Sequence, residues 1–106
     1  MKIRWMYVTT PSVNAAKEMA STLVREHLVA CANILPGMQS IYPWKGKIEE
    51  GQECVLILKT TEIQEEAVTQ RVRELHEDEV PCVLSLSVEG GNPEFLEWIK
   101  EETKGS

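Results

Sequence analysis

The sequence predicts an α+β fold in which two helices cover one face of a four-stranded antiparallel sheet. A chain of 106 residues is long enough for one domain with its own core and too short for two. Its hydrophobic pattern alternates between strand and helix periods in the order β-α-β-β-α-β, with a further helix at the end. Two strands are apolar on both faces, as expected for the central strands of this split βαβ arrangement.

The first half of the chain predicts a strand, a helix and a long strand. Residues 2–10 are rich in aromatic and β-branched types and stop at Pro11, which indicates a strand. Apolar residues recur every three or four positions across residues 12–27, which indicates an amphipathic helix. Residues 29–44 contain two prolines, which predict an edge strand with a bulge or bend at Pro36-Gly37.

A hairpin joins this long strand to the next one. Gly46 can take the positive φ that a tight turn at Lys45-Gly46 requires. The returning strand ends in an unbroken apolar run, residues 54–58, which predicts burial on both faces. Each strand is near fifteen residues, roughly 50 Å, whereas a domain of this size has a radius of gyration of about 13 Å. The hairpin must therefore bend or protrude.

The remaining chain predicts a helix, a strand and a short helix. Thr61 and Gln64 have the spacing of a capping box, so we expect the second helix to start there and to continue to His76. Residues 80–88 alternate apolar and hydroxyl side chains, which predicts a half-exposed strand. The Asn-Pro pair at 92–93 favours the start of the third helix.

Residues 1–104 are predicted to form a single domain that assembles into an oligomer. Gly105-Ser106 are interpreted as a remnant of cloning. Two helices cover only one side of the sheet, so Trp5, Tyr7 and their neighbours would face water unless another chain covers them. A protruding hairpin also leaves strand edges, which native proteins pair with a neighbour. We therefore expect an oligomer built by strand pairing.

Charge and composition exclude several classes of function. Eleven Lys and Arg against seventeen Asp and Glu give a formal net charge of −6, so no nucleic-acid partner is expected. The RNA-binding use of this fold also needs an aromatic motif that the chain lacks. No apolar stretch has the length of a signal peptide or membrane span, so we expect a cytoplasmic protein without membrane contact. Three widely spaced cysteines indicate reduced, buried thiols.

His76 is the first candidate for a functional residue. It precedes Glu77, Asp78 and Glu79 at a predicted helix end, and these side chains offer nitrogen and oxygen ligands to a divalent metal. The alternative interpretation is that the imidazole interacts with the helix dipole and that the acids form a solvated turn. Both interpretations remain open from the residues alone.

A second candidate site lies at the hairpin tip around Trp44. Lys59, Glu53 and Glu79 are candidates to converge with this aromatic residue at the end of the sheet and to line a ligand cleft between subunits. The alternative is that Trp44 packs on a neighbouring subunit while the charges keep the hairpin soluble. Motifs for phosphate loops, nucleophile elbows, zinc proteases and dinucleotide binding are absent, so no enzyme is predicted.

The chain resembles the CutA family in several segments that agree in order and spacing. They are LVACANILPG at 28–37, SIYPWKGKIE at 40–49, LKTT at 58–61, ELH at 74–76 with VP at 80–81, and LEWI at 96–99. The resemblance implies a ferredoxin-like fold and a tight homotrimer made through extended hairpins. It also implies an association with divalent-cation tolerance, especially to copper, and a shape similar to PII-type trimeric signalling proteins.

Carried over from family members with a copper site, the ligand set is incomplete in this chain. His76 corresponds to one ligand, whereas the Cys and His that complete the site align with Val8 and Leu75, which cannot coordinate a metal. Members commonly read His-Pro-Tyr where His76 is followed by Glu77 and Asp78. The resemblance thus leaves a Cu²⁺ site of His76, completed by Glu77, Asp78 or another subunit.

Three hypotheses of function follow. The leading one is a trimeric, non-enzymatic, cation-responsive protein of the CutA type, which holds a metal or small ligand in clefts between subunits. The second is a structural or signalling scaffold on which metals act only indirectly. The third is an enzyme that uses Cys54 or His76. It is disfavoured because the sequence shows no nucleophilic side chain paired with a general base.

Overall fold

Four strands and three helices make up the computed structural model, which describes residues 2–103. In chain order they are β1 (Ile3–Thr10), α1 (Val13–Arg25), β2 (Cys31–Trp44), β3 (Lys47–Thr61), α2 (Glu65–Leu75), β4 (Val83–Ser87) and α3 (Pro93–Glu102). The strands form one antiparallel sheet in the order β2-β3-β1-β4. The predicted α+β, ferredoxin-like fold is confirmed. Residue 104 and the Gly105-Ser106 tail lie outside the described residues.

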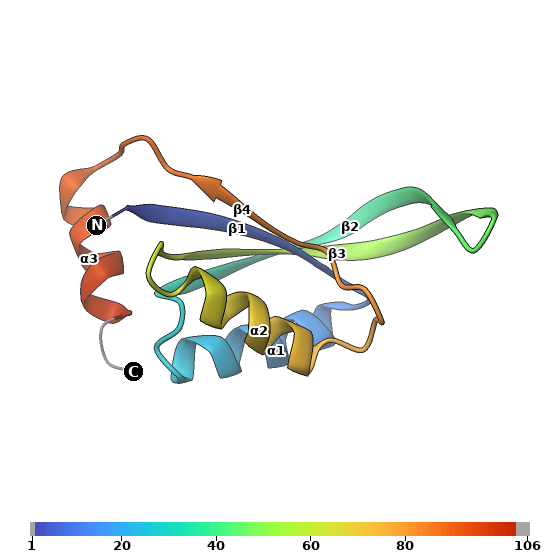
Figure 1. Ribbon diagram of the computed structural model, residues 1–106, viewed down its shortest axis with the longest axis horizontal. Helices are drawn as coiled ribbons and strands as arrows, with labels where there is room; N and C mark the ends of the chain where they lie inside the picture. The colour runs from blue at the N-terminus through green and yellow to red at the C-terminus, as the bar shows by residue number, and fades with distance from the viewer. Residues whose placement is uncertain (1, 104–106) are drawn as a thin grey trace.

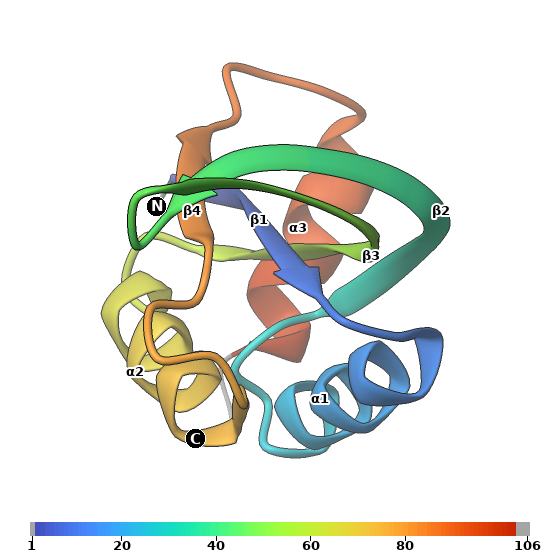
Figure 2. The same ribbon diagram turned by 90° about the vertical axis from the view of Figure 1, so that its right-hand side faces the viewer.

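Helices α1 and α2 lie side by side against one face of the sheet, and α3 lies at the end where β1 begins (Figures 1 and 2). Buried side chains from β1, β3 and both helices form the main core: Met6, Val8, Leu23, Leu56, Leu58, Val68 and Val72. Burying each of these side chains contributes roughly 1.5–3 kcal/mol. β1 and β3 are the central strands, as their apolar residues on both faces predict. In the described chain no helix is long and apolar enough to cross a membrane.

Two of the helix starts follow from local sequence. The Ser12 side chain accepts a hydrogen bond from the backbone N–H of Ala15 at 3.0 Å and caps α1. Asn92 caps α3 by accepting from the N–H of Glu94 at 3.1 Å, with Pro93 in the first turn. Both starts agree with the expected positions.

The predicted capping box at the start of α2 is wrong. Thr61 is the last residue of β3, where it pairs with Ile3 and is almost completely buried. Gln64 precedes the helix without a capping bond of its own, because its amide donates instead to the carbonyl of Thr103 at 3.0 Å. The helix begins at Glu65, and His76 follows it as the C-cap. Thr61 is thus used in the pairing of β3 with β1, and Gln64 in a hydrogen bond to the end of α3, so neither side chain caps α2.

β2 and β3 form a long hairpin that projects beyond the helices (Figure 1). Lys45 and Gly46 make its two-residue turn, both with positive φ, 51° and 82°. β2 is an edge strand, as its prolines predict. A bulge interrupts its register between Leu35 and Met38, where Gly37 has a φ of 82°. The protruding hairpin gives the protomer extents of 45 × 25 × 21 Å.

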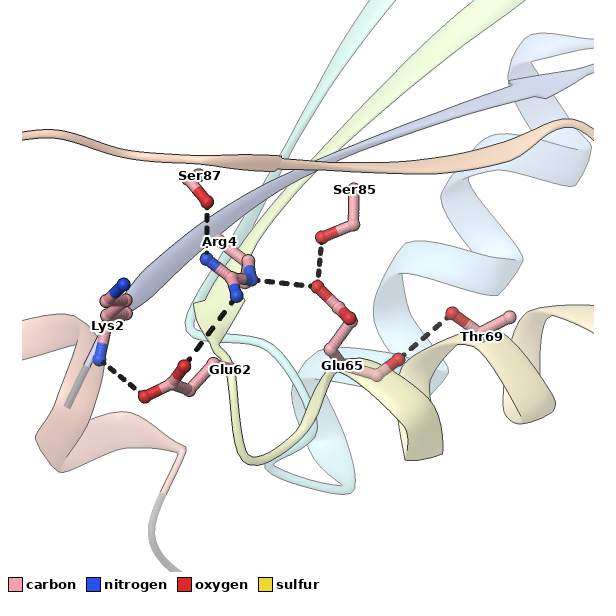
Figure 3. Close-up of polar contacts among 7 residues, drawn as sticks. All are labelled: Lys2, Arg4, Glu62, Glu65, Thr69, Ser85 and Ser87. Atoms are coloured by element: carbon pink, nitrogen blue, oxygen red, sulfur yellow. Dashed lines mark hydrogen bonds and ion pairs between the residues drawn. The ribbon is translucent and has the colours of Figure 1, made fainter.

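β4 alternates as predicted, but its apolar side faces away from the helices. Ser85 and Ser87 lie on the helix side, where Figure 3 shows them bonded to Glu65 and Arg4. Arg4 Nη1 donates to Ser87 Oγ at 2.7 Å, and Arg4 Nε donates to Glu65 Oε1 at 2.8 Å. The Ser85 hydroxyl donates to the same Glu65 oxygen. This polar network joins the edge strand to α2.

The side of the sheet away from α1 and α2, here named the open face, is apolar and largely uncovered. Cross-strand pairing places these side chains on it: Trp5, Tyr7, Leu35, Ile57, Leu84 and Leu86. Leu35 is 53% exposed and Leu84 is 59% exposed. α3 covers only one end of this face, through Ile99 against Ile3 and Ala30. The uncovered apolar patch expected from the sequence is thus present in the protomer.

Candidate ligand cleft

A cleft of about 850 Å³ lies between the protruding hairpin and the segment that links α2 to β4. We name it the hairpin cleft. Its lining includes three aromatic side chains, two sulfur-containing ones and four acids: Tyr7, Tyr42, Trp44, Met38, Cys82, Glu53, Glu77, Asp78 and Glu79. Its volume falls in the range that binds small molecules, roughly 300–1,000 Å³.

The bulge in β2 decides which hairpin residues share a face of the sheet with Tyr7 and Glu53. Leu35 pairs with Val55, but Met38 pairs with Glu53, so β2 gains one residue over β3 at this point. Since side chains alternate along a strand, the extra residue moves Tyr42 and Trp44 to the open face, the side of the sheet from which Tyr7 reaches the cleft. The Pro36-Gly37 pair predicted a bulge or bend at this point, but not which face Tyr42 and Trp44 would take after it.

The structure brings three of the four predicted pocket residues together. Trp44 at the hairpin tip, Glu53 in β3 and Glu79 after α2 all line the hairpin cleft. Sequence reasoning missed Tyr7, which reaches the cleft from β1 and donates its hydroxyl to Met38 Sδ at 3.3 Å. The register of β1 against β3 places Tyr7 there, and this register is not visible from the residues of β1 alone.

Lys59 does not join this group within one protomer. It lies six positions along β3 from Glu53, about 20 Å away at 3.3–3.4 Å per residue. Its Nζ donates to Asn33 Oδ1 at 2.6 Å and lies 5.7 Å from the centre of the Phe95 ring. Lys59 therefore belongs to the end of the open face near α3.

His76 is buried, with a side chain only 1% exposed, and both of its ring nitrogens have partners. Nε2 lies 2.7 Å from the carbonyl oxygen of Thr9, and the backbone N–H of Asp78 donates to Nδ1 at 3.0 Å. A carbonyl oxygen can only accept, so Nε2 carries the proton and Nδ1 is the acceptor. Neither nitrogen has a lone pair free for a metal in this arrangement.

The donor set of one protomer does not fit a copper ion. Across residues 2–103, no group of three His, Cys, Asp or Glu side chains lies close enough to hold a metal. The His76 ring instead ties the start of the α2–β4 segment to the end of β1. Its contacts are those of a structural histidine, and they position the acidic wall of the hairpin cleft.

The hairpin cleft carries an excess of negative charge. Glu53, Glu77, Asp78 and Glu79 line it, and Lys45 is the cation at its mouth. Lys45 Nζ lies 4.0 Å from Glu79 Oε1 and 5.8 Å from the centre of the Trp44 ring. The mouth therefore holds an ammonium group between a carboxylate and an aromatic ring.

The cysteines are free, and their burial differs from the prediction. Cys54 is buried, whereas Cys31 and Cys82 are partly exposed. Burial raises the pKa of the Cys82 thiol, and the nearby Glu53 carboxylate acts in the same direction, against the bond to Thr9. Cys82 is therefore a thiol at neutral pH, which is a poor nucleophile and a poor metal ligand.

Comparisons with known proteins cover nearly the whole chain. Residues 4–102 match the family model described as CutA1 divalent ion tolerance protein. The chain is 44% identical over 101 residues to "Protein CutA 1, chloroplastic" of Oryza sativa, covering 95% of this chain and 57% of that protein. It is 43% identical to the "Divalent-cation tolerance protein CutA" of Thermus thermophilus, covering 91% and 93%.

Solved structures agree with these sequence matches. The crystal structure of CutA1 from Oryza sativa superposes with a TM-score of 0.96 at 42% identity, covering 100% of this chain and 97% of that one. The chain spans a little over half the length of the rice relative and nearly all of the bacterial one.

Proposed function

This chain belongs to the CutA1 divalent ion tolerance family, and on that premise we propose a homotrimeric, non-enzymatic divalent-cation tolerance protein that binds its ligand in clefts between subunits. The open face is the observation that carries this proposal. A protomer that leaves Leu35, Leu84 and Leu86 about half exposed on one side of its sheet has an incomplete core. A second copy of the chain completes it.

Continuity between the open face and the hairpin cleft supports a ligand site at the subunit boundary. Tyr7 belongs to both, since its ring lines the cleft and pairs across the sheet with Leu84 on the open face. A subunit packed on the open face therefore reaches the edge of the cleft. The long hairpin offers further backbone edges for strand pairing with that subunit.

Two observations support a non-enzymatic role. The Cys82 thiol is held in its protonated form, and both nitrogens of His76 are used by backbone groups. Neither residue is available as an activated nucleophile or a general base.

A cytoplasmic location remains a prediction. The absence of nucleic-acid and membrane partners is a prediction as well, and the net charge of −6 favours it.

The geometry of His76 favours the second candidate function, a trimeric scaffold on which metals act indirectly. Direct copper binding at His76 requires the ring to give up its bond to Thr9 or to Asp78. Because the ring is buried, such a change would also move the segment that carries Glu77 and Glu79.

Copper titration distinguishes the two functions. Calorimetry at pH 7.5 compares the parent with His76→Ala, with circular dichroism as the check on folding. A saturable Cu²⁺ site that disappears in His76→Ala supports direct binding. Equal affinity in both proteins supports the scaffold. Light scattering on the same samples tests the trimer, and a mass of one subunit contradicts the proposed assembly.

A further inference from the structure

We propose that the hairpin cleft binds a small organic cation, an alkylammonium or quaternary ammonium group, between the Trp44 ring and the Glu79 carboxylate, where the protein's own Lys45 ammonium lies in the free state. This ligand class presupposes the cleft binding proposed above and names its chemistry.

Lys45 shows how the mouth of the cleft accommodates an ammonium group. Its Nζ lies 5.8 Å from the centre of the Trp44 ring, within the roughly 6 Å over which a cation is attracted to an aromatic face. The same nitrogen is 4.0 Å from Glu79 Oε1. The protein thus presents a ring and a carboxylate at distances that suit one positive charge.

The Lys45 contact is weak enough for a ligand to replace it. The side chains of Lys45 and Glu79 are 73% and 74% exposed, so water screens their attraction and both keep much of their freedom. A ligand that brings its own charge to the same place, with carbon groups against the aromatic lining, displaces Lys45 into solvent at little cost.

The charge of the cleft selects for a cation. Four carboxylates line it, from Glu53 on the hairpin and from Glu77, Asp78 and Glu79 on the α2–β4 segment. An anionic ligand would be repelled, and an uncharged apolar ligand would leave these groups with poorer solvation.

The same lining favours an organic cation over a bare metal ion. In the part of the chain that the structure describes, no three carboxylate, imidazole or thiol side chains converge on one point. Tyr7, Tyr42 and Trp44 instead provide aromatic surface, which attracts ammonium groups and adds nothing to the coordination of a divalent ion. The volume of about 850 Å³ also exceeds the needs of a single ion.

The acidic wall is held in place before any ligand arrives. The buried His76 ring bonds to Thr9 in β1 and to the backbone of Asp78, which fixes the segment that carries Glu79. On the other wall, Trp44 is the last residue of β2 and pairs with Lys47 across the turn. A preorganised site loses less entropy on binding.

Choline is the probe that tests this proposal. In an NMR titration of the assembled protein at low ionic strength, we expect choline to shift the indole N–H resonance of Trp44 with saturation. That resonance is identified as the one missing from Trp44→Leu. The uncharged isostere of choline, in which carbon replaces the quaternary nitrogen, should leave it unmoved. Equal shifts from both compounds overturn the proposal.

Two matched pairs of variants test the position of the ligand. Lys45→Gln should tighten choline binding about two- to five-fold, because it removes the internal competitor, whereas Lys47→Gln removes the same charge from the hairpin without vacating the site. Glu79→Gln should weaken binding about two- to five-fold, and Glu50→Gln, on the opposite side of the hairpin, should not.

If both variants of either pair change the choline affinity equally, the proposed position of the ligand is wrong, and choline responds only to the total charge of the protein. Choline that fails to bind Lys45→Gln overturns the ligand class. These outcomes are independent of the proposed function: a trimer that responds to Cu²⁺ and ignores choline contradicts this inference alone. A monomer that binds choline contradicts the assembly alone.

Discussion

His27 and Lys45 are the two non-glycine residues of the described chain with a left-handed backbone, at φ values of 60° and 51°. Each lies where an element must end, His27 just after α1 and Lys45 in the hairpin turn. This conformation costs an L-residue roughly 1–2 kcal/mol, least for Asn and Asp. Lys45 therefore combines a strained backbone with a side chain at the mouth of the hairpin cleft.

Lys45→Asn is expected to stabilise the protein by about 0.5–1 kcal/mol, because Asn-Gly is the preferred pair for a two-residue turn with positive φ. Urea denaturation of the assembled protein measures the change. Lys45→Gln is the control, since Gln removes the charge without favouring the left-handed region. No difference in stability between these two variants would show that the backbone of residue 45 is unstrained.

At the scale of elements, the bulge in β2 and the turn that follows it determine what the hairpin presents. Gly37 has a φ of 82°, and the register gains one residue between Leu35 and Met38. This gain places Tyr42 and Trp44 on the cleft side. A local backbone feature thus determines the composition of the candidate site.

Gly37→Ala is expected to cost about 1–2 kcal/mol, the penalty of a left-handed backbone for a residue with a Cβ. Gly51→Ala is its matched control. Gly51 lies in the same hairpin without a positive φ, and at both positions an added Cβ would meet no atom within 4 Å. Thermal or urea denaturation compares the two. A loss of stability as large for Gly51→Ala as for Gly37→Ala would contradict the role of the bulge.

The ion pair between Arg71 in α2 and Glu26 at the end of α1 predicts how the stability of the protein depends on pH. Arg71 in α2 donates to both oxygens of Glu26, each at 2.9 Å, and to Glu74 at 3.1 Å. The hydrogen bond from Arg71 lowers the pKa of Glu26 below its ordinary value of 4.5. The ionised form is therefore favoured in the folded state, and the contribution of Glu26 to stability is present above pH 4.5.

As the pH falls from 4.5 through the lower folded-state pKa, this contribution is lost. Glu26→Gln should be less stable than the parent at neutral pH and should approach it on acidification, as followed by urea denaturation over a pH series. Glu50→Gln, which removes one carboxylate from the hairpin, is the matched control. A constant difference for Glu26→Gln would mean that the Arg71 contact does not favour the carboxylate.

For the whole molecule, the open face is the feature on which the proposed assembly rests. β4 turns Leu84 and Leu86 away from the helices because Ser85 and Ser87 bond to Glu65 and Arg4 on the helix side (Figure 3). The sheet is thereby left with an apolar surface that α1 and α2 do not cover, which is the reason for the proposed trimer.

If the proposed trimer forms through the open face, Leu84→Glu is expected to reduce the mass in light scattering from three subunits to one, because a charge buried in that contact lacks a partner there. Ile63→Glu is the control: Ile63 is 68% exposed but lies in the turn before α2, away from the open face. Loss of assembly in both variants would indicate general destabilisation, and retention in both would place the subunit contact elsewhere.

Local sequence was enough to predict the order of elements, the edge position of β2, the hairpin turn and the start of α3 at Asn92-Pro93. These depend on signals within a few residues: prolines that cannot join a central ladder, a glycine that tolerates positive φ, and Asn92 beside a helix start. Two strands apolar on both faces were also enough to identify the centre of the sheet and the uncovered open face.

Which distant residues meet follows from the fold and not from local spacing. Thr61 belongs to the β3 ladder opposite Ile3 and not to a helix cap, and Lys59 lies far from Glu53 although both belong to one strand. His76 donates its Nε2–H to Thr9, 67 positions earlier in the chain, and accepts the N–H of Asp78 at Nδ1, so neither nitrogen has a lone pair free for a metal. Such outcomes depend on strand register and on competition between distant hydrogen-bond partners, and local spacing contains no information about either.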